Sequence, residues 1–304
     1  MSMENTASFE QMQFLKANVG RVTWIGLIIN VVLSILKLIF GLIGHSQALV
    51  ADAFHSLSDL ATDFAVLLGV KYWAVPPDEA HPYGHKRIET MVTSMIGLAL
   101  AGVGVGIGYE ALSTIRDSHD AHPGWIAFIV AVISIVSKEI LYHWTKKIGK
   151  RIKSSAVVAN AWHHRTDALS SIPVAIAIVV AVIYPDLAYV DHLGALVVSV
   201  FIVYSAWEIL KPTLFELSDA SASKDVCEKI KELISSMDGI KSVHAIRTRR
   251  MGGGIYMDLH IMVDENLSVR EGHEIARKAR RKLLAEGPDI NDVIIHIEPY
   301  EENH

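Results

Sequence analysis

Residues 51–63, ADAFHSLSDLATD, place four ionisable side chains in a stretch that is otherwise apolar. These side chains are Asp52, His55, Asp59 and Asp63, at positions i, i+3, i+7 and i+11. At roughly 100° per residue, such positions fall within one helix stripe about 80° wide. Burying charge in lipid costs free energy, so ionisable residues inside a membrane span are candidates for function. We therefore interpret this segment as a transmembrane helix with one functional face.

A second apolar segment carries the same pair of side chains. In AWHHRTDALSS, residues 161–171, His163 and Asp167 are four residues apart and share a helix face. His55 and Asp59 have the same spacing, so two facing helices offer two nitrogens and two carboxylate oxygens. This set of four ligands suits Zn²⁺. A buried hydrogen bond between helices is the alternative interpretation, and two matching pairs favour the metal site.

Other ionisable residues in the apolar segments are expected to have lesser roles. His164 is expected to face outward or to lie beside the ligands, and Asp52 and Asp63 to lie on the entry path or beside the ligands. Lys138 and Glu139 are interpreted as a local ion pair or as side chains that extend to the membrane surface. Fe²⁺, Co²⁺, Ni²⁺ or Cd²⁺ could use the same ligand set, whereas Mn²⁺ prefers more oxygen.

The composition predicts a membrane protein with a soluble part. Of the 304 residues, 51% are hydrophobic and 20% are charged, and the net charge of −5 does not suggest a nucleic-acid partner. A helix that spans the bilayer needs ~20 mostly apolar residues. Six segments reach this length, and the second contains the charged stretch. They cover residues 22–44, 47–75, 88–112, 125–144, 155–184 and 188–210.

The distribution of Lys and Arg supports six spans, because cytoplasmic loops are enriched in these residues. Residues 1–21 are polar and do not resemble a signal peptide. With this segment in the cytoplasm, the basic segments 71–87 and 146–153 fall on the same side. Leaving out the charged second span would place them on opposite sides. We expect a six-helix transmembrane domain over residues 22–211, with both termini in the cytoplasm.

Residues 212–304 are expected to form a cytoplasmic domain. Helical spacing and strand alternation predict its elements, with a turn at the three consecutive glycines 252–254. Ser268 and Glu271 form a capping-box pattern at the start of a helix. The expected elements are a helix at 225–237, strands at 242–250 and 254–264, a helix at 268–286 and a strand at 293–298. This αββαβ order predicts a small two-layer α+β domain.

Two further groups of potential metal ligands lie outside the predicted spans. In DEAHPYGH, residues 78–85, the spacing of Asp78, His81 and His85 is typical of metal ligands on a short loop. The second group is a set of histidines and one carboxylate on the predicted strands and the second helix of the cytoplasmic domain. Together they predict a site for one or two ions, formed by His244, His260, His273, His296 and Glu298.

These motifs resemble the cation diffusion facilitator family of divalent metal transporters. The resemblance rests on ADAFHSLSD (51–59), HPYGHKRIE (81–89), AWHHRTDALSS (161–171) and HIEP (296–299), and it extends over almost the whole chain. It implies a homodimer in the lipid bilayer whose cytoplasmic domains have a ferredoxin-like, metallochaperone-like fold. It also implies a secondary active transporter rather than an enzyme, with no organic cofactor.

The resemblance assigns roles to individual residues. It implies that the transport site consists of His55, Asp59, His163 and Asp167. The loop ligands match a second site, and the five candidates in the cytoplasmic domain match a binuclear site near the dimer interface. Family members often carry Asp where this chain has Glu298. By the same resemblance, Arg87 and Asp219 form a charge pair that links the membrane and cytoplasmic parts.

We therefore expect efflux of a divalent metal, most simply Zn²⁺, in exchange for protons by alternating access. Zn²⁺ is expected both as the substrate and as a regulatory ligand of the cytoplasmic domain. The compact loops fit a prokaryotic inner membrane. One alternative is a membrane sensor that binds metal without moving it. Another is a membrane metalloenzyme, but the predicted helices lack the Glu-x-x-His motifs of di-iron bundles.

Overall fold

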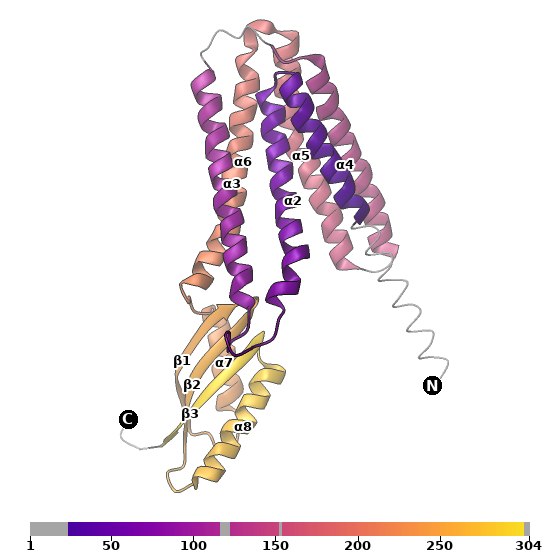
Figure 1. Ribbon diagram of the computed structural model, residues 1–304. Coiled ribbons are helices and arrows are strands. Elements are labelled where there is room, and N and C mark those ends of the chain that lie inside the picture. The colour runs from indigo at the N-terminus through magenta and orange to yellow at the C-terminus, as the bar shows by residue number, and fades with distance from the viewer. Residues whose placement is uncertain (1–23, 116–121, 152–153, 301–304) are drawn as a thin grey trace, which may run out of the picture. The chain divides into compact units, whose positions relative to one another are not determined.

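Figure 1 shows the computed structural model of the chain. It describes residues 24–115, 122–151 and 154–300, so the expected cytoplasmic segment at residues 1–21 lies outside the described part. The chain divides into two compact units, and each is described by itself. The first contains the chain up to Val66 and Ile96–Glu208, and the second contains Leu67–Met95 and the chain from Ile209 onward.

Six long helices occupy the predicted membrane domain in the described part of the chain. They are Trp24–Ile43, α2 (Gln47–Trp73), α3 (Lys86–Thr114), α4 (Trp125–Arg151), α5 (Ser155–Ile183) and α6 (Tyr189–Leu217). By length and composition, five of them are long and apolar enough to cross a membrane within the described residues, and α2 is not among these five. The predicted helix with the ionisable side chains is therefore present as α2.

The start of α2 is held by a carboxylate from α6. The first N–H groups of a helix have no partner within the helix, and a negative charge there is favourable. Asp191 is buried and accepts hydrogen bonds from the Ser46 hydroxyl at 2.7 Å and from the Ala48 backbone N–H at 3.2 Å. This interaction fixes the end of α2 against α6 inside the first unit.

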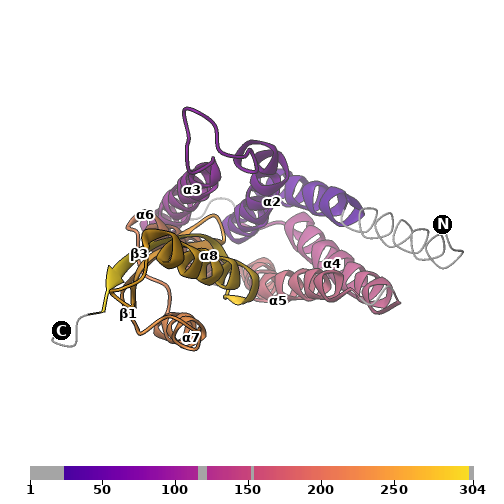
Figure 2. The same ribbon diagram turned by 90° about the horizontal axis from the view of Figure 1, so that it is seen from below.

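Helices α4 and α5 form a closely packed antiparallel pair, and they lie side by side in both Figure 1 and Figure 2. Small side chains let helix backbones approach closely in membranes. A Cβ atom at Gly149 would lie only 2.9 Å from the Val158 side chain. The hydroxyl of Ser154 accepts the backbone N–H of Val157 and caps the start of α5. This packing turns one face of α4 toward α5, the helix that carries the predicted ligands His163 and Asp167.

The last long helix runs further than the sequence predicted. We expected the span to end at residue 210, but α6 continues through Pro212 to Leu217. A proline inside a helix removes one backbone hydrogen bond. The Thr213 hydroxyl donates to the carbonyl oxygens of Ile209 and Leu210, which keeps polar groups near the proline satisfied. The helix therefore persists where composition alone suggested a boundary.

The C-terminal domain has the expected αββαβ order. Its elements are α7 (Lys224–Ser235), β1 (Ser242–Met251), β2 (Gly254–Val263), α8 (Val269–Glu286) and β3 (Ile290–Pro299). Strand β2 is central, antiparallel to β1 and parallel to β3. Gly252 and Gly253 have φ angles of 55° and 72° in the turn between β1 and β2. A two-residue hairpin turn favours glycine at such positions.

One face of the sheet contributes to the hydrophobic core of the C-terminal domain. Leu259 and Ile261 of β2 are fully buried, and they belong to one cluster with Ile230 of α7 and Leu283 of α8. Successive side chains of a strand point to opposite faces, so His260 lies on the other face. In the described residues, α7 and α8 pack on the core face and not on this one, so its polar side chains remain accessible.

The first turn of α8 contains the predicted capping box. The hydroxyl of Ser268 accepts the backbone N–H of Glu271, and the Glu271 carboxylate accepts the Ser268 backbone N–H at 2.8 Å. Hydrogen bonds from Ser268 lower the pKa of Glu271. A lowered carboxyl pKa contributes stability at neutral pH, and this contribution is lost as the pH falls through the lowered value.

We predict that Ser268→Ala will destabilise the start of α8 by about 1 kcal/mol, the usual value of an N-cap. Hydrogen exchange of the first α8 turn in the full chain measures this change. Ser223→Ala is the matched control, because Ser223 precedes α7 without a capping hydrogen bond from its side chain. Equal effects in the two variants would contradict the assigned role of the capping box.

Candidate metal sites

Helices α2 and α5 bring together three of the four predicted transport-site residues. Asp59 on α2 and His163 and Asp167 on α5 each offer a ligand atom, and these atoms lie within 4.8 Å of one another. The Nδ1 atom of His163 is 3.8 Å from Oδ1 of Asp167. Asp167 is buried, whereas the His163 side chain is about half exposed. Imidazole and carboxylate groups at this spacing can hold a divalent metal.

His55 is the predicted ligand that stands apart from this cluster. It lies one turn before Asp59 on α2, but its ring nitrogens are not part of the 4.8 Å group in the described residues. Its Nδ1 atom is buried and has no hydrogen-bond partner in the described part of the chain. A buried polar atom without a partner is costly. A metal ion bound with His55 would remove this cost.

A lysine that the sequence did not connect with the site lies beside it. Nζ of Lys138, on α4, is 3.1 Å from Oδ2 of Asp167, and the lysine is only 3% exposed. We expected Lys138 to pair with Glu139 or to reach the membrane surface, and this expectation is wrong. The close packing of α4 on α5 directs Lys138 inward. Glu139 instead contacts His143, at 3.2 Å.

A second buried lysine joins the first helix to α2 and α5. Lys37 has no exposed surface, and its Nζ lies 2.7 Å from Oδ2 of Asp52. The same ammonium donates to the hydroxyls of Ser56 and Ser171, and Ser171 in turn donates to Asp52 at 3.0 Å. Asp52 is therefore half of a buried ion pair. The signal in the sequence was a single lysine within the apolar segment 22–44.

The two remaining candidates in the predicted spans are Asp63 and His164. The side chain of Asp63 lies outside the part that the structure describes. His164 is buried rather than outward-facing, and it packs toward the first helix. A Cβ atom at Gly26 would lie 3.2 Å from Nε2 of His164, so a glycine leaves room for the ring. The His164 ring thus packs between α5 and the first helix, next to His163 in the sequence.

The loop before α3 brings its three predicted ligands together. The ligand atoms of Asp78, His81 and His85 lie within 4.8 Å of one another. Each histidine has a ring nitrogen 3.4 Å from an Asp78 oxygen, and the two ring centroids are 4.2 Å apart. Gly84 has a φ angle of 83°, a conformation that glycine adopts without strain, and it turns the chain between the histidines.

Backbone hydrogen bonds prepare this loop for a cation. The N–H of His81 donates to the Asp78 carboxylate at 2.6 Å, and the Asp78 N–H donates to the carbonyl oxygen of His81. The first of these bonds lowers the pKa of Asp78. The carboxylate is therefore ionised at neutral pH, the form that binds metal.

The open face of the sheet in the C-terminal domain carries a row of histidines. His244, His260 and His296 are in register across β1, β2 and β3. Their neighbouring ring centroids are 5.2 and 4.8 Å apart. The Glu298 carboxylate lies 3.1 Å from His244, 2.8 Å from His260 and 3.5 Å from His296. Three of the five predicted residues therefore surround the carboxylate of a fourth, Glu298.

The fifth residue of that prediction lies elsewhere. His273 is exposed on α8, which packs on the opposite face of the sheet, so the sheet separates it from Glu298 within one chain. The sequence also gave no sign of a β-bulge directly after His244, where Ala245 has a φ angle of 49°. Bulges re-aim neighbouring side chains and often occur at functional sites.

The predicted charge pair between the start of α3 and the end of α6 is present. The Arg87 guanidinium donates to the Asp219 carboxylate. Next to it, Glu216 accepts the Thr90 hydroxyl at 2.6 Å and the Gly252 backbone N–H at 2.8 Å. These contacts all lie within the second unit, and they connect both helix ends with the turn between β1 and β2.

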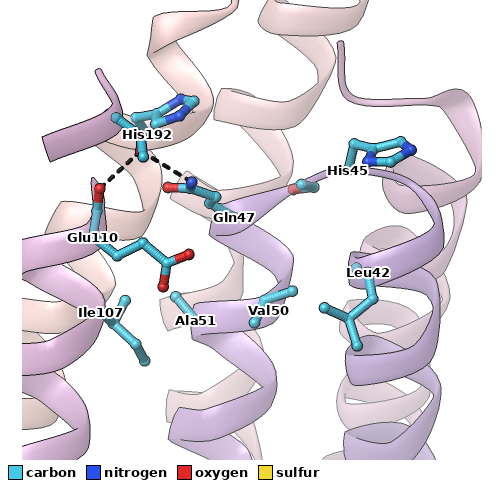
Figure 3. A pocket seen from close by; sticks show the side chains of 11 residues that line it. Leu42, His45, Gln47, Val50, Ala51, Ile107, Glu110 and His192 are labelled. Atoms are coloured by element: carbon cyan, nitrogen blue, oxygen red, sulfur yellow. Dashed lines mark hydrogen bonds between the residues drawn. The ribbon is translucent and has the colours of Figure 1, made fainter. Parts of the chain in front are cut away.

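A cavity of about 420 Å³ lies where α2 and α6 begin and α3 ends (Figure 3). His45, Glu110 and His192 contribute ionisable groups to its lining, and Leu42 and Ile107 contribute apolar surface. The amide of Gln47 donates to the Thr114 hydroxyl, which donates to the Glu110 carbonyl oxygen. The cavity is therefore lined by both polar and apolar side chains.

Two family models together match nearly the whole chain. The cation efflux transmembrane domain matches residues 23–218, and the cytoplasmic domain of cation efflux proteins matches residues 222–300. These matches agree with the six long helices and the α+β domain. The fold and the carboxylate–histidine clusters thus define an integral membrane protein that handles metal cations.

The sequences of two relatives, from Bacillus and Arabidopsis, support the same class. The manganese efflux system protein MneP of Bacillus subtilis is 33% identical, over 92% of this chain and 96% of the relative. Metal tolerance protein C1 of Arabidopsis thaliana is 34% identical, over 90% of this chain and 61% of the relative. The metal-bound C-terminal domain of the CzcD transporter from Thermotoga maritima is 31% identical, covering 26% of this chain and 93% of that one, with a TM-score of 0.25.

The chain belongs to the cation diffusion facilitator family. It is a divalent metal efflux transporter with a helical transmembrane domain and a C-terminal α+β domain.

We predict that Glu298→Gln will lower the number of Zn²⁺ ions bound per chain, because the variant removes the carboxylate shared by three histidines. Isothermal titration of the detergent-solubilised full chain measures this number. His273→Ala is the control, and it should bind as many ions as the unaltered chain. A loss in His273→Ala with no loss in Glu298→Gln would contradict the assigned cluster.

Proposed function

We propose that this transporter exports Zn²⁺ from the cytoplasm in exchange for protons. The observation that carries the proposal is the meeting of Asp59, His163 and Asp167 between two long helices, with an unpartnered nitrogen of His55 one turn away. Carboxylates and imidazoles must lose protons to bind a metal. Metal entering from the cytoplasm would therefore release protons, and protons arriving from the other side would release the metal.

The identity of the ion depends on His55. With His55, the site offers two nitrogens and two carboxylate groups, a set that suits Zn²⁺. Without His55, a single imidazole and two carboxylates remain, and this oxygen-rich set favours a harder ion. Mn²⁺ is therefore the second candidate, which the name of the 33%-identical Bacillus relative also supports. Fe²⁺, Co²⁺, Ni²⁺ and Cd²⁺ remain alternative substrates.

Transport requires the site to open to each side of the membrane in turn. In the expected topology, residues 1–21 and the C-terminal domain are in the cytoplasm of a prokaryote, and the membrane is its plasma membrane. The cavity of Figure 3 would then lie at the external ends of the helices. Its side chains His45, Glu110 and His192 would receive the ion as it leaves.

The other two clusters would bind Zn²⁺ as a regulatory ligand. The loop cluster contains Asp78, and the sheet cluster is centred on Glu298. We propose that two copies of the chain associate through their cytoplasmic domains and that metal strengthens this association. Such binding regulates transport when the metal has higher affinity for one conformation than for the other.

We predict that Asp59→Ala and Asp167→Ala will abolish Zn²⁺ uptake into proteoliposomes with an acidic interior. Each variant removes a carboxylate ligand, and a carboxylate binds metal only when it is ionised. Glu139→Gln is the control, because this carboxylate contacts His143 outside the cluster. A protonophore that collapses the pH gradient should also stop concentrative uptake by the unaltered chain. Undiminished flux in both aspartate variants would refute the site assignment.

We further predict that His55→Ala will reduce Zn²⁺ flux much more than Mn²⁺ flux. The variant removes a nitrogen ligand, whose loss matters more for zinc than for a hard ion. The measurement compares initial uptake rates for the two ions in the same vesicles. A stronger effect on Mn²⁺, or a chain that moves Mn²⁺ and no Zn²⁺ before any substitution, would identify manganese as the substrate.

A further inference from the structure

The cluster proposed for transport already contains a positive charge that belongs to the protein. The Asp167 carboxylate divides its two oxygens between different partners. Oδ1 lies 3.8 Å from His163, and Oδ2 lies 3.1 Å from the Lys138 ammonium. Lys138 is also the donor of a hydrogen bond to Oδ2. An ion coordinated by Asp167 would therefore share this carboxylate with the lysine.

The position of Lys138 differs from that of the other buried lysine. Lys37 is paired with Asp52, which is not in the cluster, and two serine hydroxyls complete its hydrogen bonds. Lys138 has Asp167 as the acceptor of its hydrogen bond, and that acceptor is a proposed metal ligand. The charge of Lys37 is thus satisfied with or without metal. The charge of Lys138 is balanced by Asp167, a carboxylate of the proposed metal site.

Two cations that share one carboxylate weaken each other's binding. Where water is scarce, the electrostatic interaction between unit charges a few ångströms apart is strong. Between two cations this interaction is repulsive. An opposite charge within ~4–6 Å changes the proton affinity of a carboxylate by roughly one to three powers of ten. The same electrostatics apply to a metal ion at that carboxylate, so the ammonium must lower the affinity of the site for metal.

We propose that Lys138 is a tethered cation that lowers the affinity of the transport site for its metal and so permits release. This inference rests on the proposed function, because it assumes that the ion binds Asp59, His163 and Asp167. It adds a positioning residue on α4 to a site otherwise built from α2 and α5. In the metal-free state, Lys138 balances part of the negative charge. In the metal-bound state, it opposes the ion.

The test measures metal affinity in the full chain reconstituted in lipid nanodiscs. The background carries Asp78→Ala and Glu298→Ala, which disable the loop and sheet clusters. In this background, Lys138→Met should bind Zn²⁺ about tenfold more tightly or better. Its turnover in proteoliposomes should fall, because tighter binding slows release. Lys138→Arg keeps the charge and should bind with nearly unaltered affinity.

Lys146→Met is the matched control. Lys146 lies on the same helix, but its ammonium contacts the Tyr142 hydroxyl and its ring rather than a metal-site carboxylate. This variant should leave the affinity unchanged. Unchanged or weaker binding in Lys138→Met would overturn the proposal. Lys138→Gln serves as the second variant if methionine prevents folding, and it has the same expected direction.

The unaltered chain provides an independent measurement. Saturating Zn²⁺ should loosen the contact between Lys138 and Asp167 and increase the modification of Lys138 by an amine reagent, detected by mass spectrometry. Lys146 should react equally with and without metal. Equal modification of Lys138 in both states would overturn the proposal, even if every substituted protein failed to fold.

The outcomes separate this inference from the proposed function. If Asp59→Ala and Asp167→Ala retain full flux, the transport site itself has been assigned wrongly. If both lose flux while Lys138→Met gains no affinity, the transport site stands and only the role of the lysine is refuted.

Discussion

The neutralisation of buried charge is the constraint on which the transmembrane unit depends. Hydrocarbon offers no water to solvate an ion, so a carboxylate between these helices needs a nearby cation. Lys37 pairs with Asp52, and Lys138 pairs with Asp167. Each pair joins a helix that carries proposed metal ligands to a helix that carries none. The first helix and α4 thus contribute to the charge balance of the site without contributing a ligand.

The same constraint explains how far the sequence predicted the site. Spacing within one helix depends on backbone geometry alone, so the pairs His55/Asp59 and His163/Asp167 could be recognised from their intervals. The partner of Lys138 depends on how α4 is rotated against α5. That rotation follows from the packing of small residues along both helices, which intervals within one helix do not encode. Lys138 was therefore recognised in the sequence, but its contact with Asp167 was not predicted.

In the cytoplasmic domain, alternation along the strands predicted which side chains share a face, and the register of β1, β2 and β3 confirms that face for His244, His260 and His296. The prediction did not separate His273 from the residues on the strands. It grouped residues by their ability to bind metal and did not consider that the helices and the open face lie on opposite sides of the sheet. The bulge at Ala245 was also missed, since alanine gives no signal for a positive φ angle. Local periodicity was thus informative, and irregular backbone was not.

The three clusters differ in their surroundings, and this difference has consequences for binding. Asp78 and Glu298 lie in clusters that water reaches, where solvent can screen or replace protein contacts. Asp167 is buried, so its partners must come from the protein or from the transported ion. An accessible cluster can therefore lose its metal without rearrangement of the protein. The buried Asp167 carboxylate needs an internal cation such as Lys138 whenever the metal is absent, and this requirement couples metal release to the position of a side chain.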